Sequence, residues 1–171
     1  RAEKVKGQAL MLKALKRLDD DHIRIHIAGD GAELDALKKL AQKLDLSPQV
    51  AFHGFLSKKE LEQLYQITDL AVLTSFSESF PLVLLEASDN LVPILSTDVG
   101  DIKMMIPDFE HGFIAKIGNV ESIANAIEEA VNKPKKELEQ IAVNEKRYLE
   151  SHFSIKNQLQ SIEKVYNLII K

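Results

Sequence analysis

Short apolar runs alternate with longer segments of helical periodicity along the whole chain. The runs have the length and the β-branched content of buried strands, whereas the segments between them repeat apolar residues every three or four positions. This alternation predicts a parallel sheet with helices on both faces, an α/β fold of the doubly wound class. In such a sheet, ligands bind at the carboxyl ends of the strands. We predict strands at 23–28, 50–54, 70–74, 92–97 and 113–117, and helices at 7–19, 32–45, 58–67, 81–90, 101–106, 120–131, 135–151 and 154–170.

The composition of the chain excludes several classes of protein. The chain has 171 residues, which is enough for one domain with a core, and a net charge of -4. This charge creates no overall field that attracts nucleic acid or an anionic bilayer. The absence of cysteine excludes disulfides, thiol nucleophiles and cysteine-ligated metals. No apolar run reaches the roughly 20 residues of a membrane span, and we expect a cytoplasmic protein.

The stretch from Ser77 to Glu86 is the candidate site for chemistry. It follows the predicted strand at 70–74 and leads into a predicted helix. Ser77 or Ser79 is expected to cap this helix, with Pro81 in its first turn. The free backbone N–H groups at the start of the helix, together with its dipole, would hold a phosphate or another anion.

Two carboxylates, Glu78 and Glu86, lie in this stretch with seven residues between them. Helical side chains lean back toward the N-terminus, so Glu86 can face the same crevice as Glu78. Hydroxyl groups of a sugar or a ribose are ligands that would account for two acids beside an anion site. Either glutamate alone could be an ordinary solvated acid, and this alternative stays open.

The segment Glu-Ser-Phe-Pro-Leu-Val-Leu-Leu-Glu-Ala-Ser, residues 78–88, resembles the double-glutamate signature of the retaining, nucleotide-sugar-dependent glycosyltransferases of family 4. Arg1 and Lys6-Gly7 resemble the Arg…Lys-Gly element of that family. The resemblance covers nearly the whole chain and implies the GT-B fold, with this chain as its Rossmann-like C-terminal half. Further matching segments are Ile25–Gly31, Val50–Phe55, Val92–Gly100 and His111–Ile114.

The resemblance also implies roles for individual residues. The candidate catalytic residues are Arg1 and Lys6, which would stabilise a leaving diphosphate, and Glu78, which would hold the donor sugar. Glu86 would bind ribose hydroxyls. Lys6 could instead be a solvated helix-end lysine. The other candidate substrate-binding residues are Gly54, Phe55, Ser79, Phe80, Pro81, Leu82 and Val83.

Some positions depart from the family pattern. Pro81 stands where the family often has glycine, and it removes one backbone donor from the anion-facing turn. Gly100-Asp101 and Met104 replace the two glycines and the later glutamate that are frequent in the family. Phe55 could flank a base, or it could be a packing residue.

The implied function is that of a donor-binding domain in a hexosyltransferase. Such an enzyme moves a hexose, with retention, from a nucleotide diphosphate sugar to a glycan or lipid-linked acceptor, here in cell-surface polysaccharide synthesis. No metal and no cofactor are expected. The expected partner is an N-terminal GT-B domain that binds the acceptor, and the full-length protein could associate peripherally with the inner face of the membrane. A nucleotide-sugar-binding or assembly module without catalysis is the alternative.

The strand order of this fold places one more strand at the centre of the sheet, between the strands at 23–28 and 70–74. In the family, that strand ends just before the arginine that matches Arg1. We therefore expect the chain to be part of a longer polypeptide and these two strands not to pair with each other. We treat 1–171 as one domain, in which the helix at 154–170 closes the fold against the partner domain.

Overall fold

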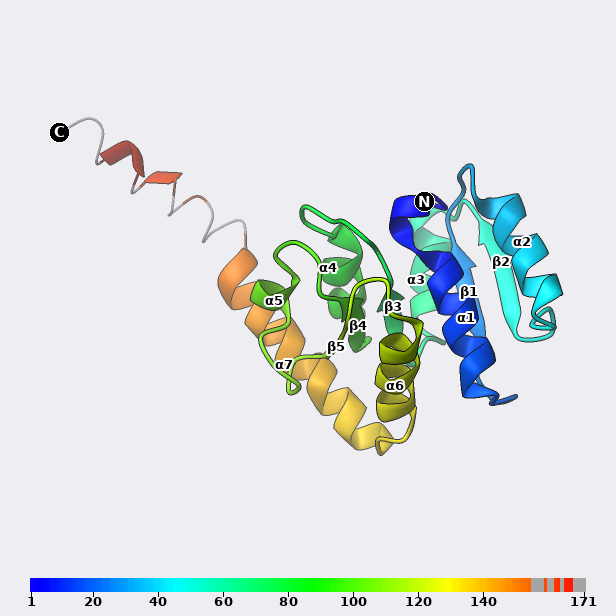
Figure 1. Ribbon diagram of the computed structural model, residues 1–171. Helices are drawn as coiled ribbons and strands as arrows, with labels where there is room; N and C mark the ends of the chain where they lie inside the picture. Colours follow the sequence, from blue (N-terminus) through cyan, green and yellow to red (C-terminus); the bar gives the residue numbers. More distant parts are fainter. Residues whose placement is uncertain (155–158, 160–161, 164, 168–171) are drawn as a thin grey trace.

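Five parallel strands and eight helices form the described part of the computed structural model, which covers residues 1–154, 159, 162–163 and 165–167 (Figure 1). The strands are β1 (Ile25–Ala28), β2 (Val50–Gly54), β3 (Ala71–Leu73), β4 (Ile94–Thr97) and β5 (Phe113–Ala115). The helices are the 3-10 helix η1 (Lys4–Lys6) and the α-helices α1 (Gln8–Leu18), α2 (Leu34–Lys43), α3 (Lys58–Tyr65), α4 (Leu82–Asp89), α5 (Ile102–Met105), α6 (Val120–Val131) and α7 (Lys135–Phe153). The expected alternation of strands and helices is confirmed.

The strands form two separate parallel sheets. One sheet has the order β1-β2 and the other has the order β3-β4-β5. Within the described residues, no pairing joins β1 to β3. This confirms the expectation that the strands at 23–28 and 70–74 do not pair. Whether the chain is part of a longer polypeptide stays a prediction.

The first residues of the chain connect the carboxyl ends of the two sheets. The Ala2 N–H donates to the Asp30 carbonyl at 2.9 Å, just after β1. The Phe76 N–H donates to the Val5 carbonyl at 2.8 Å, just after β3. Residues 2–5 therefore lie across the gap between the sheets, at the edge where a ligand is expected.

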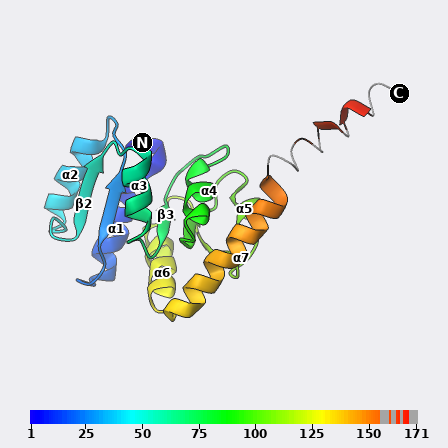
Figure 2. The same cartoon turned by 180° about the vertical axis from the view of Figure 1, so that it is seen from behind.

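Two hydrophobic cores lie on opposite faces of the sheets. Helices α1, α2 and α6 cover the face nearer the viewer in Figure 1, and α1 packs along α6. Helices α3 and α4 cover the opposite face, which comes forward in Figure 2. Alternate strand residues supply each core: Leu95 belongs to the first and Ile94 to the second, and both are fully buried. This arrangement confirms the doubly wound α/β class.

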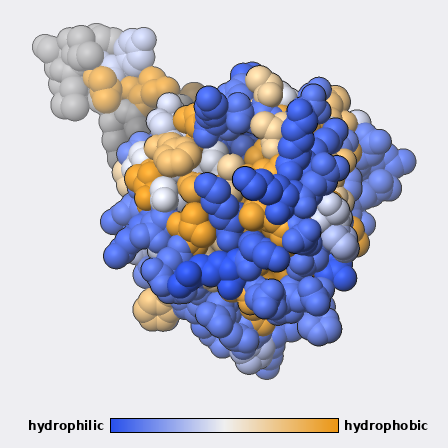
Figure 3. All heavy atoms as spheres, turned by 45° about the vertical axis from the view of Figure 1, so that its right-hand side comes forward, coloured by the Kyte–Doolittle hydropathy of each residue, from blue (hydrophilic) through white to orange (hydrophobic). Residues whose placement is uncertain are grey.

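Helix α7 closes the second core. It packs against α4 and α5, and its buried residue Leu149 belongs to this core, whereas Ile141, nearer its start, belongs to the first core. The view in Figure 3 shows a mostly hydrophilic face, with apolar side chains in smaller patches. Among the described residues, no helix has the length and apolarity needed to cross a bilayer. The helix expected at 154–170 lies largely outside the described residues.

Candidate functional site

Lys6, Glu78 and Ser75 form a polar cluster at the carboxyl end of β3. The Lys6 ammonium donates to both carboxylate oxygens of Glu78, at 2.8 Å to Oε1 and 3.0 Å to Oε2. The Ser75 hydroxyl donates to Glu78 Oε1 at 2.6 Å. The Glu78 side chain is only 9% exposed, so its carboxylate oxygens bond these two partners and have little access to water.

Backbone contacts between β3 and the start of α1 place Lys6 in this cluster. Lys6 is the last residue of η1, and the left-handed Gly7 follows it and caps α1. The Thr74 hydroxyl donates to the Lys6 carbonyl at 3.2 Å. These contacts hold the Lys6 backbone against the end of β3, and the lysine side chain then reaches Glu78.

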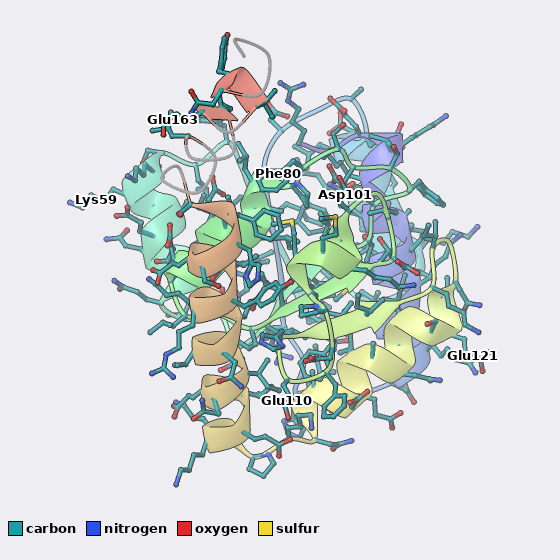
Figure 4. All side chains as sticks on the ribbon, turned by 90° about the vertical axis from the view of Figure 1, so that its left-hand side faces the viewer. Lys59, Phe80, Asp101, Glu110, Glu121 and Glu163 are labelled. Atoms are coloured by element: carbon teal, nitrogen blue, oxygen red, sulfur yellow. The ribbon has the colours of Figure 1, made fainter. Side chains whose placement is uncertain are left out.

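The turn after β4 supports the Glu78 loop from the other side. Gly100 has φ +53, and a Cβ on it would lie 2.3 Å from the Glu78 carbonyl oxygen. Only glycine permits this approach. Figure 4 shows Phe80 and Asp101 at the same end of the molecule, near the upper end of α7 in that view. The loops after β3 and β4 therefore meet, as expected for strand ends at one edge of a parallel sheet.

Helix α4 starts one residue later than expected and is capped differently. The prediction that Ser77 or Ser79 caps this helix is wrong, because Pro81 occupies the N-cap and no side chain caps it. The serines lie in the extended loop that carries Glu78, so they are too early in the chain to reach the first turn. The Leu84 N–H donates to the Pro81 carbonyl at 3.0 Å, so the N–H groups of Leu82 and Val83, which precede it in the first turn, are the ones without intrahelical partners.

Glu86 is exposed on α4 and does not join the Lys6–Glu78 cluster in any recorded contact of the described residues. It lies on the side of α4 that faces Tyr65, the last residue of α3. Burial, and after it the negative charge of Glu86, raise the pKa of Tyr65 to about 12. Glu86 therefore lies near the end of α3, and its carboxylate is not a partner of Lys6 in the described contacts.

The remaining candidate residues lie along the same edge, near the end of β1. The Gly29 N–H donates to the Gly54 carbonyl at 2.7 Å, and a Cβ on Gly29 would lie 3.0 Å from the Arg1 nitrogen. The Arg1 side chain is 81% exposed and pairs with Glu3 at 3.7 Å rather than with the cluster. Phe55 is 84% exposed, so the packing alternative for this ring is wrong.

An apolar rim borders the polar cluster. Phe80, Leu82 and Val83 are 41%, 63% and 38% exposed. The Phe80 ring contacts the Phe153 ring at the end of α7, with centroids 5.7 Å apart. Pro81 is buried and Ser79 is exposed. The rim therefore consists of side chains that turn outward at the start of α4.

Two hollows of about 330 and 360 Å³ lie elsewhere on the surface. The first lies beside α5 and β5, and the second lies against α7 near His111. Neither is lined by Lys6, Glu78 or Glu86. Within the described ranges, no three His, Asp or Glu side chains gather as a metal site.

Sequence reasoning missed Ser75 and Thr97. Both are fully buried, and the Thr97 hydroxyl donates to the Ser75 carbonyl at 2.7 Å. Their signal was present, because each is a polar residue at the carboxyl end of an otherwise apolar strand. Such residues face the ligand edge of a doubly wound sheet.

Comparison with known protein families identifies the family of the chain. The family model described as "Glycosyl transferases group 1" matches residues 1–148. The chain belongs to this family. The fold agrees with the C-terminal, Rossmann-like domain of GT-B glycosyltransferases, as expected from the sequence.

Curated relatives of this glycosyltransferase family are similar over most of the chain. The putative glycosyltransferase EpsD of Bacillus subtilis is 33% identical over 131 residues, which cover 75% of this chain and 34% of EpsD. The D-inositol 3-phosphate glycosyltransferase of Rhodococcus erythropolis is 32% identical over 120 residues, or 70% of this chain and 27% of the relative. The chain thus spans about a third of the length of these relatives.

Solved glycosyltransferase structures superpose on nearly all of the chain. Anabaena HepE, in complex with UDP and glucose, matches with a TM-score of 0.84 and 25% identity, covering 98% of this chain and 46% of HepE. The C-terminal domain of the glycosyl transferase group 1 protein LpcC from Francisella tularensis matches with a TM-score of 0.78 and 24% identity. That match covers 90% of this chain and 82% of the LpcC domain, and it concerns the fold alone.

Proposed function

We propose that the chain is the donor-binding domain of a retaining hexosyltransferase that uses a nucleotide diphosphate sugar. The Lys6–Glu78 pair carries this proposal, since it places a cation and a carboxylate together beside the free N–H groups of α4. The similarity to HepE, whose structure contains UDP and glucose, supports a nucleotide sugar as the ligand. The acceptor is a glycan or a lipid-linked acceptor, and the role is in cell-surface polysaccharide synthesis.

Each part of the edge has a role in this proposal. Lys6 and the backbone N–H groups of Phe80, Leu82 and Val83 bind the diphosphate. Arg1 leaves Glu3 and turns toward the same phosphates; its exposed side chain is free to do so. Glu78 holds the sugar through its hydroxyls.

The nucleoside occupies the gap between the two halves of this edge. Glu86 binds the ribose hydroxyls from α4. Phe55 flanks the base, because its exposed ring at the end of β2 offers a flat apolar face. Gly54, Ser79, Phe80 and Pro81 shape the loops around the ligand.

The proposed reaction breaks the bond between the anomeric carbon and the diphosphate oxygen. A bond from the acceptor hydroxyl oxygen to the same carbon forms on the same face of the sugar, and the hydroxyl proton ends on the departing phosphate. Fixed positive charge at Lys6 and Arg1 stabilises the leaving diphosphate without a divalent ion or a cofactor. Glu78 stabilises positive charge that develops at the anomeric carbon.

Calorimetry of the chain with UDP, GDP, ADP and their sugars tests the proposal. We expect one nucleotide to bind, and Lys6→Ala to weaken it by about tenfold or more, because a charge-assisted phosphate contact contributes roughly 1.5–3 kcal/mol. Lys16→Ala is the matched control: it removes an exposed lysine from α1, far along the helix from Gly7. Failure of every nucleotide at millimolar concentration would count against the proposal.

The partners in this proposal are the donor, the acceptor and an acceptor-binding GT-B domain, with no nucleic acid. We place the protein in the cytoplasm, at the inner face of the membrane when it works on a lipid-linked acceptor. Turnover in a protein that carries both domains distinguishes an enzyme from a binding or assembly module. Glu86→Ala should reduce turnover sharply in the enzyme, whereas a module would keep its partner interaction.

A further inference from the structure

The Lys6 ammonium group has two partners in the proposed function, the Glu78 carboxylate and the donor diphosphate. It has three N–H donors, and two of its contacts go to the Glu78 carboxylate. A diphosphate that needs more than the one remaining N–H donor of Lys6 competes with this pairing. Because the Glu78 side chain is only 9% exposed, water could replace the lost Lys6 contacts only in part.

Ser75 is the second partner of Glu78, and it is held independently of Lys6. Its residue is fully buried at the end of β3, and its carbonyl accepts the Thr97 hydroxyl from the neighbouring strand β4 at 2.7 Å. Thr97 is also fully buried. The Ser75 hydroxyl has a single hydrogen, and that hydrogen is directed at Glu78 Oε1 at 2.6 Å. Neither of these two contacts of Ser75 involves Lys6.

We infer that Ser75 is a positioning residue for Glu78. Its hydroxyl keeps one carboxylate oxygen in place when the donor diphosphate draws Lys6 away, and the other oxygen, Oε2, becomes available to a sugar hydroxyl. Before the donor binds, the Glu78 carboxylate thus accepts hydrogen bonds from Lys6. After the donor binds, a sugar hydroxyl takes the place of Lys6. This inference rests on the proposed function and adds a residue to it, since Ser75 acts through Glu78 and touches neither substrate.

The first test compares UDP with UDP-glucose as calorimetric probes. Positioning of Glu78 concerns the sugar, so Ser75→Ala should reduce the preference for UDP-glucose over UDP by about tenfold while changing UDP affinity less than about twofold. Ser75→Thr, which keeps the hydroxyl, should restore the preference. Equal weakening of both probes would show a merely structural role and overturn the inference.

Ser96→Ala is the matched control for this test. Ser96 is as buried as Ser75 and lies on β4, but its hydroxyl donates to the Thr97 carbonyl at 3.0 Å and not to the cluster. We expect Ser96→Ala to leave the preference for UDP-glucose unchanged. If Ser96→Ala lowers the preference as much as Ser75→Ala does, loss of a buried hydroxyl explains the effect and the inference fails.

The second test needs no ligand. In a thermal double-mutant cycle, Ser75→Ala and Glu78→Ala should be coupled by about 2–4 °C in melting temperature. The coupling should persist in the Lys6→Met background, because Ser75 holds Glu78 without Lys6. Its disappearance there would overturn the inference. If neither UDP nor UDP-glucose binds the unaltered chain, the proposed function fails, and the cycle still decides whether Ser75 holds Glu78.

Discussion

Gly7 lies directly against the backbone of Thr74. A Cβ on Gly7 would come within 2.1 Å of the Thr74 carbonyl oxygen, and Gly7 has φ +65, in the left-handed region. The contact joins the residue after Lys6 to the strand that leads to Glu78. Backbone packing, rather than the Lys6–Glu78 ion pair alone, therefore sets where the two charged groups meet.

Gly7→Ala should destabilise the protein by about 3 kcal/mol or more, because it combines left-handed strain with a clash against backbone. Gly54→Ala is the matched control. Gly54 has nearly the same φ, +63, but a Cβ there meets nothing within 4 Å. This control should lose only about 1–2 kcal/mol from strain. Urea denaturation measures both, and equal losses would show that the contact with Thr74 is unimportant.

Glu145 on α7 should make the protein less stable as the pH rises. It is fully buried, neither carboxyl oxygen has a hydrogen-bond partner among the described residues, and burial raises its pKa to about 9. The unfolded chain releases this proton near pH 4.5 and the folded chain keeps it. Stability is therefore full below about pH 4.5 and falls between pH 4.5 and 9, by at most about 1.4 kcal/mol per pH unit.

Glu145→Leu tests this pH dependence, because leucine has no proton to lose. Urea denaturation at pH 5, 6, 7 and 8 should show that the free energy of unfolding of the variant increases relative to that of the wild type as the pH rises. Glu150→Leu, on the exposed side of the same helix, is the control and should show no such trend. A constant difference between Glu145→Leu and the wild type across this range would mean that Glu145 is ionised in the folded protein.

Substitutions of the two glutamates should differ in their effects on nucleotide binding and on turnover. Glu86→Gln should weaken nucleotide binding by about tenfold, because a carboxylate that accepts ribose hydroxyls contributes through charge-assisted hydrogen bonds. Glu78→Gln should weaken it less and should mainly reduce turnover in a two-domain enzyme. Glu128→Gln, an exposed change on α6, serves as the control. Calorimetry and rate measurements that gave the reverse order would exchange the two roles.

The unpaired edges of β1 and β3 should exchange their amide hydrogens quickly. The Ile25 N–H donates toward β2, to Gln49, at 2.8 Å, and the Ala71 N–H donates toward β4, to Pro93, at 2.9 Å. Neighbouring residues on a strand point their N–H groups to opposite sides, so those of His26 and Val72 face the gap. We expect these two amides to exchange about tenfold faster or more than those of Ile25 and Ala71. Equal protection would show that the gap is closed in solution.

Local patterns in the sequence predict most of the elements. The strand at 50–54 and the helix at 120–131 have the expected bounds, and the other expected elements within the described residues differ by a few residues at their ends, whereas the 3-10 helix η1 was not predicted. Apolar periodicity and turn residues act over a few neighbouring positions, so the sequence alone is sufficient to show them. The same local information suggests an anion site after β3, because a strand, a loop and a helix follow each other there.

Contacts between distant residues could not be predicted in this way. His26 and His53 bond each other at 2.9 Å across β1 and β2, and neither this contact nor the register shift between Ile27 and Ala28 is visible in either strand alone. The cap of α4 is likewise decided by the path of the loop, which makes Pro81 the cap.

The candidate site likewise has features that the sequence predicts and features that only the tertiary structure shows. The sequence by itself determined that Lys6, Glu78 and Glu86 are candidates, because their types and spacing resemble a known signature. Only the tertiary structure decided that Lys6 and Glu78 pair and that Glu86 faces Tyr65 instead. It also decided that Ser75 belongs to the site. The physical reason is that pairing of charged and polar side chains depends on which strands lie side by side and on how little water reaches them, and a single sequence encodes neither locally.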